Sequence, residues 1–234
     1  MIGPLVVAGA SGGCGASLIA GALALRWAAA GGRPWLLELD LERGDLAGAW
    51  DLPADRTIAD LVPVAAELDG GHLRAAALPH PSGVSLLPGP GAPGAADAWD
   101  DAALGRLVDA AAGEGQVVVD AGAGLGRPGL VAAERGGGVL VVCPPTLAGA
   151  RRARRLLDAL AARGADRRAA VVVSAGPERG EIGARALGRA LAVSVVAELP
   201  WARREGMELS AGRWSSGRGR RLHRAVERLA EAIA

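Results

Sequence analysis

The chain has 234 residues, half of them apolar, and a formal net charge of +1. It contains no lysine and no tyrosine, which excludes any chemistry that needs a lysine amine or a tyrosine phenol. The length and apolar content suit one α/β domain spanning residues 1–234. No apolar stretch reaches the length of a membrane span, and the N-terminus lacks the pattern of a signal peptide, so we expect a cytoplasmic protein with no integral membrane segment.

The stretch from Leu5 to Ser17, LVVAGASGGCGAS, predicts a buried strand, a glycine-rich turn and the start of a helix that runs to Ala30. Backbone N–H groups at such a helix N-terminus are suited to binding phosphate. Two phosphate-binding motifs can be aligned with this stretch. Gly9, Gly13 and Gly15 match the G-x-x-x-G-x-G turn of a dinucleotide site of the short-chain dehydrogenase kind. Alternatively, residues 9–17 match a P-loop with alanine where its lysine is expected.

Strands and helices alternate along the rest of the chain. A strand at Pro34–Leu39 is followed by a helix that a Thr57 and Asp60 capping box opens and that we expect Gly70-Gly71 to close. The pattern then predicts strands at 84–87, 116–120, 139–143, 169–174 and 193–199, and helices at 99–112, from 128 onward, and at 146–163, 182–191 and 220–233. The alternation predicts a doubly wound, mainly parallel sheet covered by helices on both faces.

Acidic side chains lie at the ends of two predicted strands. Glu38 and Asp40 end the second strand, and Asp120 ends the strand QVVVD. Ligands bind at this edge of open α/β sheets, so each acid is a candidate site residue. A dehydrogenase would use an acid here for the ribose, but it also needs a Tyr-x-x-x-Lys pair that this chain lacks. The dinucleotide interpretation therefore survives only as a non-catalytic binder.

The P-loop interpretation gains support from two residues. Ser17 directly follows the loop, where a hydroxyl would coordinate Mg²⁺, and Asp120 ends a plausible Walker-B strand.

Cys14 and Cys143 lie far apart in the sequence and suit reduced thiols. The three histidines show no metal-ligand spacing, so a separate metal site is not expected.

Taken together, these stretches resemble the MinD/ParA group of P-loop ATPases, and within it the CpaE/TadZ and septum-site-determining branch. The resemblance covers essentially the whole chain. The segments that carry it are Ser11–Ser17 on the K-G-G-x-G-K-[ST] loop, Leu37–Leu41 with Gly44-Asp45 on the first switch, Asp120–Gly124 on the D-x-P-P-G second switch without its prolines, Val139–Cys143 with Pro144–Arg151 on a V-V-x-P…R element, and Leu199-Pro200 on the closing I-P.

The resemblance implies a SIMIBI-class P-loop fold that binds ATP or ADP with Mg²⁺. The nucleotide contacts carried over by position are Ser11, Gly12, Gly13, Cys14, Gly15, Ala16, Ser17, Leu18 and Ser174, the last where an asparagine often meets adenine. The implied metal ligands are Ser17, Asp40 and Asp120. Asp40 also resembles the aspartate that positions the attacking water.

Two departures from the family pattern lower the expected activity. Ser11 replaces the signature lysine that reaches across the dimer, and Ala16 replaces the lysine that holds the β- and γ-phosphates. Each missing ammonium removes charge-assisted hydrogen bonds of about 1.5–3 kcal/mol. We therefore expect weak nucleotide binding and weak or absent ATP hydrolysis.

The sequence thus predicts a degenerate regulator of septum placement or pilus-assembly localisation. We expect a protein partner in that machinery, a possible homodimer, and recruitment to the membrane or pole by the partner. The alternatives are an active ATPase, in which an arginine replaces the lysines, and a ParA-like binder of non-specific DNA. Residues 151–234 carry 18 arginines against 9 acids, and a polyanion would contact the clusters Arg151, Arg152, Arg154 and Arg155, and Arg218, Arg220, Arg221 and Arg224.

Overall fold

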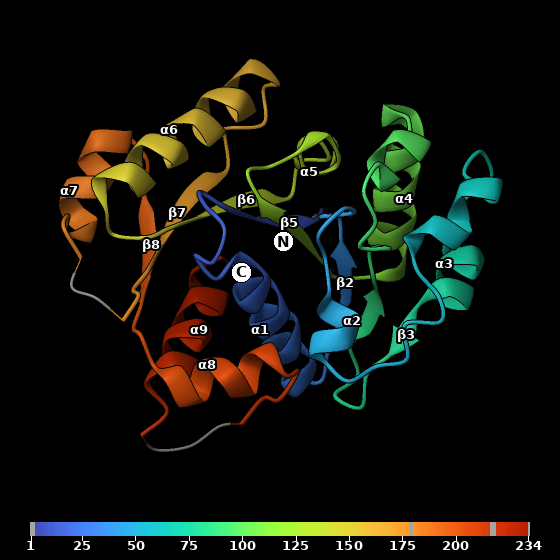
Figure 1. Cartoon of the computed structure of the whole chain (residues 1–234), viewed down its shortest axis with the longest axis horizontal. Helices are drawn as coiled ribbons and strands as arrows, with labels where there is room; N and C mark the ends of the chain where they lie inside the picture. Colours follow the sequence, from blue (N-terminus) through green and yellow to red (C-terminus); the bar gives the residue numbers. More distant parts are fainter. Residues whose placement is uncertain (1–2, 178–179, 216–218, 234) are drawn as a thin grey trace.

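A computed structural model describes residues 3–177, 180–215 and 219–233, and within them one eight-stranded sheet forms the centre of the molecule (Figure 1). The strand order is β3-β4-β2-β5-β1-β6-β7-β8, and every pairing is parallel except that of β3 with β4. The strands are β1 Leu5–Gly9, β2 Trp35–Glu38, β3 Leu78–Pro79, β4 Ser85–Leu87, β5 Val117–Ala123, β6 Gly138–Cys143, β7 Ala169–Ser174 and β8 Val195–Leu199. The predicted doubly wound, mainly parallel sheet is confirmed.

Helices cover both faces of the sheet. One face carries α1, α2, α8 and α9, while α3 to α7 lie over the other (Figure 1). The α-helices are α1 Ala16–Ala29, α2 Leu46–Ala49, α3 Gly70–Ala76, α4 Asp101–Glu114, α5 Arg127–Ala133, α6 Leu147–Ala162, α7 Ala184–Leu191, α8 Arg203–Ser210 and α9 Arg221–Ala232. Two short 3₁₀ helices, η1 at Ile58–Val64 and η2 at Ala95–Ala98, complete the set.

The core divides into two layers because side chains of a strand alternate between its faces. In β1, Leu5 and Val7 pack into the layer under α1 and α9, whereas Val6 and Ala8 pack into the opposite layer. All four side chains are buried, which explains why the strand is a continuous apolar run. The apolar stripe of α9 also lies in the core, since Val226 and Leu229 are buried.

The strand order determines which loops meet at the carboxyl edge. β5 lies between β1 and β2, so Asp120 comes next to both the glycine-rich turn after β1 and the acid at the end of β2. In the dinucleotide-binding order 3-2-1-4-5-6, β1 pairs with β2 directly. The insertion of β5 therefore favours the P-loop interpretation.

The helix expected from Thr57 to Gly70 is wrong in its extent. The Thr57 capping box is present, with the Ala59 N–H donating to the Thr57 hydroxyl (3.2 Å) and the Thr57 N–H donating to Asp60 (2.7 Å). It opens only the 3₁₀ helix η1, which contains Pro63. Gly70 then begins α3 instead of ending a helix, because Asp69 caps α3 by accepting the His72 N–H (2.9 Å).

Besides α3, four short elements are additional to the prediction: α2, the antiparallel strand β3, the 3₁₀ helix η2, and α8. A carboxylate ties α8 to the last helix. Glu205 on α8 accepts the N–H groups of Arg221, Leu222 and His223 at the start of α9, and the His223 ring lies 3.0 Å from the same carboxylate. Glu205 thus caps α9 from outside that helix.

Within the described ranges 3–177, 180–215 and 219–233, no helix is both long enough and apolar enough to cross a bilayer.

Candidate functional site

The glycine-rich turn forms an open backbone cradle between β1 and α1. Gly13 has φ +72° and Gly15 has φ +93°, a left-handed conformation that favours glycine. A Cβ built on Gly12 or Gly13 would meet nothing within 4 Å, so the outer side of the turn is open. Among the described residues, no side chain caps the start of α1. Its first-turn N–H groups are therefore available to an anion.

The inner side of the turn is closed by packing. A Cβ on Gly9 would lie 2.7 Å from the Cys14 sulfur and 3.3 Å from the Ala16 Cβ, so only glycine fits at the end of β1. The Cys14 thiol lies 3.5 Å from the Val142 carbonyl at the end of β6, and burial raises its pKa. Cys14 therefore acts as a small apolar residue that supports the turn.

Two buried carboxylates lie side by side near the carboxyl edge of the sheet: Glu38 ends β2, whereas Asp120 lies within β5, which continues to Ala123 beyond the predicted strand end. Glu38 and Asp120 are register partners, and each is 1% exposed. Burial raises the pKa of Glu38 to about 7 and that of Asp120 to about 6. The negative charge of Asp120 raises the pKa of Glu38 further. Two adjacent carboxyl groups that are shielded from water favour their neutral, protonated form unless a cation binds between them.

The two carboxylates differ in what they bind. Glu38 accepts the N–H groups of Leu46 and Gly89, both at 2.9 Å, and so holds α2 and the turn after β4 against the sheet. A Cβ on Gly44 would come within 2.3 Å of the Glu38 carboxyl carbon, so the chain passes closely over this side chain. Glu38 is an anchor for the segment after β2, which reasoning from the sequence did not find.

Asp120 points instead toward the glycine-rich turn. It accepts a hydrogen bond from the Gly122 N–H (3.0 Å), and the neighbouring Ser17 hydroxyl, in the first turn of α1, lowers its pKa against the larger effect of burial. One hydroxyl and one carboxylate, completed by phosphate oxygens and water, make a ligand set that Mg²⁺ accepts. Among the described residues, no group of three or more His, Cys, Asp or Glu side chains could hold a metal by itself. The residues present fit a metal that arrives with a phosphate ligand.

Asp40 lies at the same carboxyl edge of the sheet, shortly after the end of β2. Its carboxylate is 3.3 Å from the Arg43 Nε and packs on Gly122, where a Cβ would be 2.0 Å from the Asp40 Oδ2. Gly122 has φ +64°, so both its conformation and its space require glycine. The negative charge of Asp40 contributes to the raised pKa of Asp120. The fold thus brings the three predicted metal ligands, Ser17, Asp40 and Asp120, to one edge.

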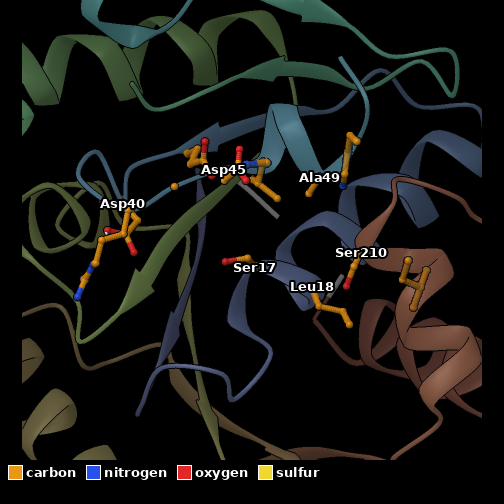
Figure 2. Close-up of a pocket in the computed structure, with 12 residues that line it drawn as sticks. Ser17, Leu18, Asp40, Asp45, Ala49 and Ser210 are labelled. Carbon is orange, nitrogen blue, oxygen red and sulfur yellow. Dashed lines mark hydrogen bonds and ion pairs between the residues drawn. The ribbon is translucent and has the colours of Figure 1, made fainter. Parts of the chain in front are cut away.

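Two cavities adjoin the glycine-rich turn. The smaller, of 290 Å³, extends from Ser17 toward α2 and α8 (Figure 2). Figure 2 shows Ser17 at the start of α1, with Asp40 and Asp45 on one side of it and Leu18 and Ser210 on the other. The smaller cavity is lined by Ser17, Leu18, Glu38, Asp40, Arg43, Gly44, Asp45, Leu46, Ala49, Trp50, Leu209 and Ser210.

The larger cavity, of 840 Å³, lies on the other side of Leu18 and is mainly apolar. Its wall includes Gly13, Cys14 and Gly15 of the turn, and Ser174 at the end of β7. A Cβ on Gly15 would be 3.4 Å from the Ser174 hydroxyl, so Ser174 borders the turn where the resemblance expects the base. Trp201, just before α8, and Met207, on α8, are exposed and form part of the rim of this cavity. Nothing in the sequence around these two residues had indicated that they border a cavity.

The cradle lacks the cations of a complete P-loop. Ala16 is 7% exposed and ends in a methyl group, and Ser11, which is half-buried, ends in a hydroxyl. Within the described lining, Arg43 is the one cationic side chain of the smaller cavity and Arg203 that of the larger. The site therefore offers backbone amides and a metal-compatible edge, with little positive charge.

No protein-family model matches the sequence, and no curated protein matches it. Solved structures do match. Cell division ATPase MinD of Pyrococcus furiosus superposes with a TM-score of 0.80 at 20% identity, over 100% of this chain and 98% of that chain. The ParA family ATPase of Chlorobium tepidum gives 0.77 at 20% identity, over 100% and 97%. The chain has the MinD/ParA fold.

A third neighbour bears on ligands. The septum site-determining protein MinD of Pyrococcus horikoshii, solved in complex with Mg-ADP, gives a TM-score of 0.77 at 18% identity over 98% of this chain and 96% of that chain. At such identities the likeness establishes the MinD/ParA fold, and the roles of individual residues stay predictions. Of the predicted contacts, residues 13–15 and Ser174 meet at the larger cavity, Ser17 lines the smaller one and Leu18 lines both.

Proposed function

We propose that this chain is a degenerate MinD/ParA-like nucleotide-binding regulator of the CpaE/TadZ and septum-site-determining kind, with weak or no ATP hydrolysis. The observation that carries the proposal is an open backbone cradle beside a Ser17–Asp120 pair, with a buried alanine in the lysine position. The cradle and the pair support binding of Mg²⁺ and nucleotide phosphates, while Ala16 argues against fast phosphoryl transfer.

The cost of the missing cations sets the expected affinity. A charge-assisted hydrogen bond contributes about 1.5–3 kcal/mol, and each 1.4 kcal/mol is a factor of ten in a binding constant. Losing one lysine thus weakens binding by roughly ten- to hundredfold. The same loss applies to the charge that develops at the phosphate oxygens during hydrolysis. Mg²⁺, when bound with nucleotide, would neutralise part of the phosphate charge.

Each chain group has a defined part in this proposal. The turn amides bind the phosphates, and the Ser17 hydroxyl and the Asp120 carboxylate would bind Mg²⁺. Asp40 accepts a proton from the water molecule at this site or orients that water. The mainly apolar larger cavity beside Ser174 takes the base. Ser17 and Asp120 are neighbours at this edge, so they need little rearrangement to bind the metal.

Calorimetry with Mg-ATP and Mg-ADP tests the proposal, using the natural chain, Ala16→Lys and Ala148→Lys. Ala148 lies exposed in the first turn of α6, so its variant places the same new charge at another helix start. We expect weak binding by the natural chain, at least tenfold tighter binding by Ala16→Lys and no gain for Ala148→Lys. Tight ATP binding by the natural chain, with steady phosphate release, would favour the active-ATPase alternative.

The proposed cellular role is septum-site selection or pilus-assembly localisation, acting with a protein partner that recruits the chain to the membrane or pole. The motifs of Ser11–Ser17 and Leu37–Leu41 support this assignment by resemblance. Among the structural neighbours is a MinC:MinD complex of Aquifex aeolicus, at 15% identity and a TM-score of 0.76 over 99% of this chain and 95% of that chain. Imaging a fluorescent fusion in dividing cells tests the role: uniform fluorescence at every stage would contradict it.

A second candidate, non-specific DNA binding, is favoured by one surface. Arg151, Arg152 and Arg155 are exposed on α6, and among the described residues none of the three has an ion-pair partner. Arg218 of the C-terminal cluster lies outside the described residues, and Arg220 pairs with Glu208. Replacing the three α6 arginines with glutamine should abolish a DNA gel shift that weakens as salt rises. A shift insensitive to salt would contradict phosphate contacts.

A further inference from the structure

Arg43 lines the smaller cavity beside the metal-compatible edge. The chain has no lysine, and within the described lining of the smaller cavity Arg43 is the one positive side chain. It shares that lining with Ser17 and with the acids Glu38, Asp40 and Asp45. A phosphate entering this cavity would meet several carboxylates and a single guanidinium, so the location of that guanidinium matters for binding.

The guanidinium connects the two segments that border the site. Its Nε lies 3.3 Å from the Asp40 Oδ1, and its Nη2 donates to the Ala123 carbonyl (3.2 Å) at the end of β5. Asp40 follows β2, so Arg43 joins the segment after β2 to the segment after β5. Figure 2 shows Asp40 on one side of Ser17, with Leu18 and Ser210 on the other.

Both contacts are long and partly in water. The Arg43 side chain is 66% exposed, whereas that of Asp40 is 16% exposed. An ion pair with such an exposed partner contributes little to stability, so the guanidinium can change partners at small cost. A phosphate is a stronger partner, because two guanidinium N–H groups can donate to two of its oxygens.

A continuous set of contacts leads from Arg43 to the glycine-rich turn. Asp40 packs on Gly122, the Gly122 N–H donates to Asp120 (3.0 Å), and Asp120 neighbours the Ser17 hydroxyl in the first turn of α1. In the proposed function the base occupies the larger cavity, beyond Leu18. Arg43 lines the smaller cavity, on the side where the phosphate farthest from the base would then lie.

We propose that Arg43 supplies the cation that the glycine-rich turn lacks, and that its guanidinium leaves Asp40 and Ala123 to bind the terminal phosphate of a nucleoside triphosphate. This rests on the proposed function, since it assumes that nucleotide binds. It adds a phosphate-binding residue and a consequence: release of Asp40 and Ala123 loosens the two segments only when a terminal phosphate is present. Arg43 therefore distinguishes a triphosphate from a diphosphate.

Calorimetry with Mg-ATP and Mg-ADP tests the proposal on the full chain and on Arg43→Gln, Arg43→Lys and Arg33→Gln. Arg33 is exposed just before β2, at the opposite edge of the sheet, which makes it the matched control. We expect Arg43→Gln to weaken Mg-ATP binding roughly tenfold or more and Mg-ADP binding less than about threefold. Arg43→Lys should recover part of the loss, and Arg33→Gln should bind like the natural chain.

A second readout locates the contact. In ³¹P NMR spectra, Arg43→Gln should move the γ-phosphate resonance of bound ATP and leave the α-phosphate resonance in place. Melting curves without nucleotide check that the variants fold, and we expect them to match the natural chain because the side chain is exposed.

The outcomes separate the two ideas. If the natural chain binds nucleotide and Arg43→Gln changes neither affinity nor the γ-phosphate resonance, the Arg43 proposal is overturned while the proposed function stands. Equal losses for Mg-ATP and Mg-ADP also overturn it, because they place Arg43 away from the terminal phosphate. If the natural chain binds neither nucleotide, both fail.

Discussion

The buried carboxylate of Glu38 predicts a stability that depends on pH. Burial raises the pKa of Glu38 from 4.5 to about 7, despite the N–H groups of Leu46 and Gly89 that favour its charged form. In the unfolded chain this carboxyl loses its proton near its ordinary pKa, so between the two values the folded state binds more protons. Stability therefore falls as pH rises through this window, and the full penalty is present above about pH 7.

Glu38→Gln is the informative perturbation, since glutamine keeps the shape and remains neutral at every pH. The difference between the two pKa values corresponds to about 3 kcal/mol when the whole window is crossed. Over the accessible range of about pH 5 to 8, the stability of Glu38→Gln relative to the natural chain should rise by about 2–3 kcal/mol. The charge of Asp120 contributes to the raised pKa of Glu38, so the comparison sets the pair of acids in the natural chain against Asp120 alone in the variant.

Urea unfolding followed by tryptophan fluorescence at several pH values measures this difference. Glu67→Gln is the control, because it makes the same side-chain change at an exposed position. A Glu38→Gln difference that stays constant within about 0.5 kcal/mol across the range would refute the reasoning. It would mean that the two amide donors already compensate for burial of the charge.

Three further predictions concern a thiol, a glycine and assembly. Burial raises the pKa of Cys143 to about 11, so iodoacetamide at about pH 7.5 should modify it far more slowly in the folded chain than in urea; equal rates would contradict its burial. Gly122→Ala should cost about 1–3 kcal/mol in urea unfolding, more than Gly124→Ala, because only the first places a Cβ against Asp40; equal losses would show that this contact is absent. The Ser11 hydroxyl carries no charge to reach a partner's nucleotide, so sedimentation velocity should show no dimer that depends on Mg-ATP; an ATP-induced dimer would favour the active-ATPase alternative.

The sequence predicts the centre of this molecule well because the signals there are local. The strands β1 and β6, and the first three residues of β5, are continuous apolar runs, which are typical of a parallel sheet buried on both faces. The acids predicted at strand ends and the glycine turn before a helix indicate which residues meet, and Ser17 and Asp120 are such neighbours, although β5 continues past Asp120 to Ala123. These features depend on the order of residues within one segment and on parallel pairing.

The features that the sequence did not predict depend on contacts between distant segments. Whether Glu38 points into the protein is decided by α2 and by the turn at Gly89, neither of which is evident from the residues around it. The pair Gly70-Gly71 can end or begin a helix, and the carboxylate of Asp69 decides for a beginning. Helix α8 is mostly polar, with Leu209 as its buried residue, so no apolar period indicated it.

The carboxylate of Glu205 gives the two C-terminal helices a shared mechanical role. It fixes the start of α9 to α8, and both helices line the larger cavity, through Leu222 of α9 and through Gly206 and Met207 of α8. The other end of α9, at Ile233, lines another cavity together with Leu5 at the start of β1. Through Glu205, the wall of the larger cavity is thus connected by one helix to the opposite edge of the sheet.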